Sequence, residues 1–68
     1  MERNIRIDWQ SVVDEAVKRR KQQGLTQKQL AILVGISTPT LIRFEHGKTS
    51  ITVASCFRIL KMLGLLED

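Results

Sequence analysis

Residues that form disulfides and metal sites are almost absent from this 68-residue sequence. Cys56 is the single cysteine and His46 the single histidine, which excludes an internal disulfide and a cysteine or histidine cluster for zinc. His46 has no partners for catalysis, and Cys56 falls on the apolar face of a predicted helix, where a buried, inert thiol is expected. We therefore expect no metal, no other cofactor and no enzymatic activity.

Long apolar runs and aromatic side chains are also scarce. No apolar run approaches the roughly 20 residues that a membrane-spanning helix needs, and no segment resembles a signal peptide. We therefore expect a cytoplasmic protein without a membrane partner. Aromatic residues make up 4% of the chain, so its core must be mainly aliphatic. The length allows one domain, and 43% hydrophobic residues is ordinary for a globular fold.

The charge of the chain is basic, with a formal net charge of +4. A basic balance in a small domain favours an anionic partner, and nucleic acid is the first candidate. The same charge fits equally well a surface that merely keeps the protein in solution. The partner must therefore be argued from the arrangement of particular residues.

Two segments in the first half of the chain carry complete helix signals. Asp8 can cap a first helix, because its carboxylate can accept an N–H of the first turn, and Gly24 can end that helix in a left-handed conformation. Thr26 and Gln29 form a T-x-x-Q capping box that starts a second helix. Gly35 ends this helix about two turns later.

A third helix follows directly and a fourth comes after a loop. The third begins at Ser37 or at Thr38, and either cap leaves Pro39 in the first turn, where its missing N–H costs little. The fourth is capped by Thr52 and ends at Gly64. Its apolar stripe, at helical spacing, consists of Val53, Cys56, Ile59, Leu60 and Leu63.

The second and third helices have the spacing of a helix-turn-helix unit. Ala31 is small enough for the third helix to approach closely, and Gly35 can take the positive φ that a sharp turn needs. The sequence thus predicts an all-α fold, a small bundle of four to five helices. We expect an N-terminal arm at residues 1–8, permitting a short strand at Ile5–Ile7, a domain at 9–64 and a short tail at 65–68.

Four stretches of the chain resemble a known family. "GLTQKQLA", "VGIS", "FEHGK" and "LKMLG" are similar to segments of the phage repressor and Cro-type (XRE-like) helix-turn-helix regulators, over about Val12 to Gly64. The resemblance implies a lambda repressor-like DNA-binding domain. In this family the first helix of the motif crosses the DNA backbone, its N-terminus near a phosphate, and the second enters the major groove.

The resemblance also implies which residues bind DNA. Arg43, on the third helix (about residues 38–46), is the expected base reader, because a guanidinium can bond O6 and N7 of guanine together. Gln27 is expected at a phosphate. The full set implied is Gln27, Lys28, Thr38, Pro39, Thr40, Arg43, Lys48, Thr49 and Ser50. Pro39 and Ile42 depart from the usual long polar side chains, so phosphate contacts or DNA shape must carry more of the recognition.

Two further sets of residues are assigned to structure and assembly. In the family, the positions of Arg20 and Glu45 form a partly buried ion pair, so we interpret both as structural. Apolar residues exceed what one small core can use, which indicates a partner surface. The expected homodimer interface is Phe57, Met62, Leu65 and Leu66, with the Asn4–Ile7 segment contributing. Alternatively, these residues fill a loose core.

These features predict a sequence-specific, double-stranded DNA-binding regulator of bacterial, phage or plasmid origin. It is expected to be a repressor that binds a palindromic operator as a homodimer. One alternative is an antitoxin that regulates its own operon and also binds a toxin, for which exposed Ile32 and Leu33 leave room. Another is a protein-interaction adaptor that has lost DNA binding.

Overall fold

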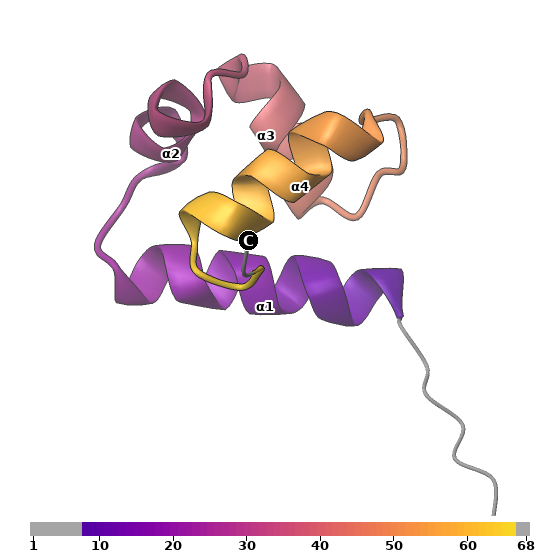
Figure 1. The fold of residues 1–68 in the computed structure, drawn as a ribbon, viewed down its shortest axis with the longest axis horizontal. Coiled ribbons are helices and arrows are strands. Elements are labelled where there is room, and N and C mark those ends of the chain that lie inside the picture. Colours follow the sequence, from indigo (N-terminus) through magenta and orange to yellow (C-terminus); the bar gives the residue numbers. More distant parts are fainter. Residues whose placement is uncertain (1–7, 67–68) are drawn as a thin grey trace, which may run out of the picture.

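The computed structural model describes residues 8–66, and this part of the chain contains four helices and no strand. The helices are α1 (Trp9–Gln22), α2 (Gln27–Val34), α3 (Thr38–Glu45) and α4 (Val53–Met62). Figure 1 shows α1 along one side of the molecule and α2 and α3 meeting at a corner; α3 packs against α1, and α4 packs against α2. The all-α prediction with a helix-turn-helix is confirmed. The strand predicted at Ile5–Ile7 lies outside the described residues.

Side-chain oxygens start the helices as the sequence predicts. Asp8 accepts a hydrogen bond from the backbone of Gln10 at the start of α1. The Thr26 hydroxyl accepts from the Gln29 N–H at 3.0 Å, and the Gln29 side chain accepts from the Thr26 N–H at 2.9 Å. At the start of α4, the Thr52 hydroxyl accepts from the Ser55 N–H at 3.1 Å. Each cap satisfies an N–H that the helix itself leaves without a partner.

The structure decides between the two possible starts of α3. Ser37 is the cap, since its hydroxyl accepts from the Thr40 N–H at 3.2 Å, while Thr38 is already helical. Pro39 is therefore the second residue of the helix. Its missing N–H is one of those that have no partner inside a helix, so the position costs no hydrogen bond.

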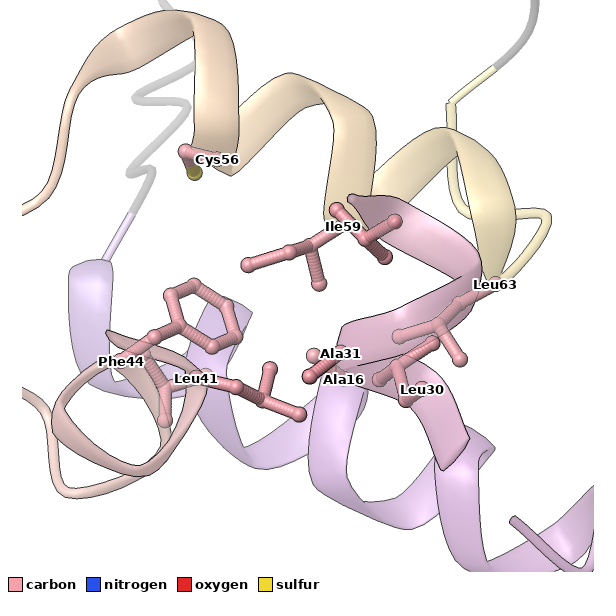
Figure 2. Close-up of a cluster of buried hydrophobic side chains, with 10 residues drawn as sticks. Ala16, Leu30, Ala31, Leu41, Phe44, Cys56, Ile59 and Leu63 are labelled. Carbon is pink, nitrogen blue, oxygen red and sulfur yellow. The ribbon is translucent and has the colours of Figure 1, made fainter. Parts of the chain in front are cut away.

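The core lies where the four helices meet, and it is mainly aliphatic. Figure 2 shows side chains from all four helices pointing toward a common centre, with Ala16 of α1 and Ala31 of α2 among them. Because these alanines are small, the helices that carry them can pack closely. The buried hydrophobic residues are Val13, Ala16, Leu30, Ala31, Val34, Leu41, Phe44, Cys56, Ile59 and Leu63.

One aromatic contact fixes the start of α1 against the end of α3. The rings of Trp9 and Phe44 meet edge to face, with centroids 5.6 Å apart and planes at 88°. The Trp9 Nε1 donates to the carbonyl of Gly47 at 3.0 Å. A half-buried tryptophan thus finds a partner for its N–H while its ring covers the core.

The prediction that Val53 faces the core is wrong, because its side chain is 70% exposed. Val53 lies in the first turn of α4, beside an open hollow that Trp9, Ile51 and Phe57 also line. Periodicity placed it on the same stripe as Cys56 and the residues that follow, but this turn extends beyond the packed helices. Separately, no helix among residues 8–66 is long and apolar enough to cross a membrane.

Candidate nucleic-acid interface

The turn between α2 and α3 is built on Gly35. Its backbone is left-handed, with φ 83° and ψ 32°, a conformation that glycine adopts without strain. The N–H groups of Gly35 and Ile36 both donate to the carbonyl of Ala31, at 2.9 and 3.0 Å. These bonds close α2 and redirect the chain within three residues, so that α3 starts at a corner of the molecule (Figure 1).

The outer face of α3 carries the predicted base-contacting residues. Pro39 and Arg43 are exposed and four residues apart, which places them on one side of the helix. Thr38 and Thr40 are half-buried, and Leu41 on the inner side is fully buried. The structure therefore turns the predicted arginine and proline outward, while each threonine presents only part of its side chain.

A chain of hydrogen bonds runs along this outer face. The hydroxyls of Ser37 and Thr40 are 2.7 Å apart, and Nη2 of Arg43 donates to the Thr40 hydroxyl at 3.2 Å. The Arg43 side chain is thereby oriented before any ligand binds. The sequence contains a signal for this chain of bonds, because Ser37, Thr40 and Arg43 are spaced by three residues.

The loop that follows α3 brings further polar residues to the same end of the helix. Lys48, Thr49 and Ser50 are all exposed. Gly47 has φ 81°, and the N–H of Lys48 donates to the carbonyl of Arg43 at 3.1 Å. The loop therefore begins directly beside the last turn of α3, and the predicted phosphate-contacting residues are joined to the predicted base-contacting helix.

At the start of α2, the structure assigns Gln27 a different partner from the one expected. Its Nε2 donates to Oε1 of Glu45 at 2.9 Å, and the residue is half-buried. One of the two N–H donors of the Gln27 amide is thus used inside the protein. The exposed side chain of Lys28 and the first N–H groups of α2 are the features here that suit an anion.

The ion pair expected between Arg20 and Glu45 is present and deeply placed. Nε of Arg20 lies 2.7 Å from Oε2 of Glu45, and the two side chains are 10% and 6% exposed. Nη2 of Arg20 also donates to Oε1 of Glu45 at 3.1 Å, and Nη1 donates to the Leu25 carbonyl at 2.7 Å. Together with Gln27, the pair joins α1, the start of α2 and the end of α3.

Exposed apolar side chains are also found on α2 and α4. Ile32 and Leu33 lie exposed on α2, and Phe57 and Met62 lie exposed on α4. Leu65 and Leu66, predicted to join the second group, are only half-buried, and Leu65 packs against the core. Leu65 is therefore partly used inside the monomer.

Cys56 and His46 are the two residues that were considered for catalysis. Cys56 is buried, and removal from water raises the pKa of its thiol, which disfavours the reactive thiolate. His46 is exposed at the end of α3. Among residues 8–66, no three His, Cys, Asp or Glu side chains are grouped closely enough to hold a metal ion.

Comparison with known proteins gives consistent matches. A family model described as "Helix-turn-helix" matches residues 18–68. An "Uncharacterized HTH-type transcriptional regulator" of Haemophilus influenzae is 33% identical over 63 residues, which are 93% of this chain and 61% of that protein. A protein of the same description from Methanothermobacter thermautotrophicus is 40% identical over 47 residues, 69% of this chain and 68% of its own.

A further relative is "Antitoxin HipB" of Escherichia coli, 39% identical over 46 residues. The match covers 68% of this chain and 52% of that protein. The chain thus spans from about half to about two thirds of the length of these three relatives.

Proposed function

The chain belongs to the helix-turn-helix family of XRE type, and on that premise we propose that it is a sequence-specific, double-stranded DNA-binding regulator of transcription. The observation that carries the proposal is the outer face of α3. The left-handed turn at Gly35 sets this helix at a corner, with Arg43 exposed and oriented by Thr40. A convex helix with an outward guanidinium suits the major groove, which is wide enough to admit an α-helix.

In this proposal the residues of the site have separate roles. Arg43 bonds O6 and N7 of a guanine, and the exposed ring of Pro39 makes apolar contact with a base edge, such as a thymine methyl. Lys48 and Lys28 contact phosphates on either side of the groove and fix the register without reading sequence. The residues proposed to bind DNA through side chain or backbone are Gln27, Lys28, Thr38, Pro39, Thr40, Arg43, Lys48, Thr49 and Ser50.

We further propose that the regulator is a repressor and acts as a homodimer. Exposed Phe57 and Met62 on α4, with half-buried Leu66, supply apolar surface that a second copy can cover. Two copies would present two α3 helices about 34 Å apart, one turn of DNA, and so read a palindrome. A protein that acts on the genome of a bacterium, phage or plasmid works in the cytoplasm.

Selection of bound sequences from a random pool of duplex DNA tests the proposal directly. We expect an enriched palindrome. Arg43→Ala should relax the preference at one position in each half-site, at a cost of about 1–3 kcal/mol in binding. Lys48→Ala should weaken all sequences evenly and reduce the slope of affinity against salt by about one.

A pool that stays random would contradict sequence-specific binding. If the wild-type protein also bound DNA weakly and without dependence on salt, a protein-interaction adaptor would become the better description. If the wild type enriches a palindrome and Arg43→Ala keeps the same base preference, Arg43 does not contact a base, but the proposal of a DNA-binding regulator still stands.

A second candidate function is an antitoxin that also regulates its own operon. The relative whose printed description is "Antitoxin HipB" favours it, as do Ile32 and Leu33, which are exposed on α2 away from the outer face of α3. Expression together with the neighbouring gene tests this candidate. A second small protein that copurifies with the wild type, but not with the double variant Ile32→Ser, Leu33→Ser, would support it. If the second protein still copurifies with the double variant, Ile32 and Leu33 do not form its binding surface.

A further inference from the structure

Arg58 is an exposed residue of α4 whose guanidinium reaches the turn of the motif. Its Nη2 donates to the carbonyl of Val34, the last residue of α2, at 3.1 Å. The same nitrogen lies against Gly35, because a Cβ built on that glycine would be 3.0 Å from it. Arg58 therefore covers the turn from the side of α4, and it does not belong to the set of residues proposed to bind DNA.

This hydrogen bond is placed where it can influence the orientation of α3. The Val34 carbonyl belongs to the peptide plane that joins α2 to Gly35, and a peptide plane is rigid. Two other carbonyls at this end of α2, those of Ala31 and Ile32, are bonded within the turn itself. The Val34–Gly35 plane is thus held at its N–H within the turn and at its carbonyl by Arg58, a positive charge at the negative end of the α2 dipole.

We propose that Arg58 is a positioning residue for DNA recognition, which fixes the angle between α2 and α3 by holding the Val34–Gly35 peptide plane. The inference rests on the proposed DNA-binding function and goes beyond it. Arg58 itself touches neither bases nor phosphates. It acts through the turn, so that Arg43 and Pro39 reach the groove together.

A positioning role predicts a particular pattern of loss. Without the bond to Val34, α3 can tilt, and contacts to base edges fail because they need defined geometry. Phosphate contacts from flexible lysines tolerate a tilt, because they depend mainly on charge. Affinity for the selected operator should therefore fall about tenfold, the size of one lost base contact, while affinity for unrelated DNA changes little.

The test compares Arg58→Met with a matched variant, Arg19→Met. Methionine keeps the apolar stem of the arginine and removes its charge and donors, which helps the variant to fold. Arg19 makes the same kind of bond at another helix end, because its Nη1 donates to the Leu63 carbonyl, just after α4, at 3.3 Å. Both variants lose one positive charge and one bond to a carbonyl at a helix end, but only Arg58 holds the turn.

Affinities for the selected operator and for a scrambled duplex should be measured across salt concentrations, with the melting temperature of each variant. We expect Arg58→Met to lose about tenfold in the ratio of the two affinities, Arg19→Met to keep the ratio, and Arg58→Lys to restore most of it. Equal losses on both duplexes, with a salt slope lower by about one than that of Arg19→Met, would make Arg58 a phosphate contact instead. An unchanged ratio would overturn the proposal. A wild-type protein that selects no operator would instead refute the DNA-binding function.

Discussion

Replacement of Glu45 by glutamine tests whether the charge of the buried ion pair holds the helices together. The substitution keeps the shape of the side chain and one oxygen that can accept from Arg20. It removes the negative charge that faces the guanidinium at 2.7 Å. Arg20 would keep its bond to the Leu25 carbonyl, which is also at 2.7 Å. The variant therefore leaves a buried cation with hydrogen bonds but without a counter-charge.

The burial of the pair sets the expected magnitude. The two side chains are 10% and 6% exposed, so water screens the lost charge poorly. Breaking a buried pair by removal of one partner costs about 3–5 kcal/mol, and we expect the lower end, because glutamine still accepts a bond. A domain of this size has a total stability of about 0.05–0.15 kcal/mol per residue. A loss of about 3 kcal/mol should therefore lower the melting temperature by roughly 12–24 °C.

Urea unfolding followed by far-ultraviolet circular dichroism measures the free energy of unfolding. Glu15→Gln is the control, because Glu15 is exposed on α1. The free energy of unfolding of this variant should differ from that of the wild type by about 0.5 kcal/mol or less. The double variant Arg20→Met, Glu45→Met should recover much of the loss, since apolar residues can replace a buried pair. If the free energy of unfolding of Glu45→Gln lies within about 1 kcal/mol of the wild-type value, the charge of the buried pair does not hold the helices together.

Three other predictions follow from single positions. Gly35→Ala should lower the melting temperature more than Gly24→Ala does. Both glycines have positive φ, but an added Cβ would lie 3.0 Å from Arg58 Nη2 at Gly35 and would meet nothing within 4 Å at Gly24. Equal falls in melting temperature would show that the Arg58 side chain moves aside without cost. Burial raises the pKa of the Cys56 thiol, so the thiol of the unfolded chain ionises first and the free energy of unfolding falls as pH rises through about 8.5 and above. Urea titrations at several pH values should show this fall in the wild type and not in Cys56→Ala, and equal falls in both proteins would contradict the prediction. Phe57→Ser should shift the proposed dimer toward monomer in sedimentation, whereas a wild-type protein that is already monomeric at tens of micromolar would count against the dimer.

The features that the sequence predicted well are those determined by neighbouring residues. The Thr26–Gln29 capping box and the left-handed turn at Gly35 depend on side chains within a few positions of each other. The start of α3 stayed open because Ser37 and Thr38 can both cap a helix, and the choice depends on how Ser37 meets Thr40. Local chemistry thus defined the helices, and periodicity gave most of the core.

The features that the sequence did not predict involve partners far apart in the chain. Gln27 meets Glu45 across 18 residues, and Arg58 meets Val34 across 24. Glutamine at the start of a helix and arginine on an exposed face are ordinary surface residues by composition, so nothing local indicated these partners. Val53 failed for a related reason, since periodicity gives the face of a helix but not where the packed surface ends.

In the proposed complex with DNA, the hydrogen bonds on α3 help a helix with few long polar side chains to discriminate between sequences. A guanidinium has five N–H donors, and the bond to Thr40 occupies one of Arg43's. The remaining donors suffice for the two acceptors of a guanine. Because Thr40 already restricts the side chain, less rotamer freedom is lost on binding, and more of the contact energy contributes to affinity. On the proposed function, one oriented arginine therefore contributes more affinity than a freely rotating one, and the shape and flexibility of the DNA supply discrimination at positions that α3 does not touch.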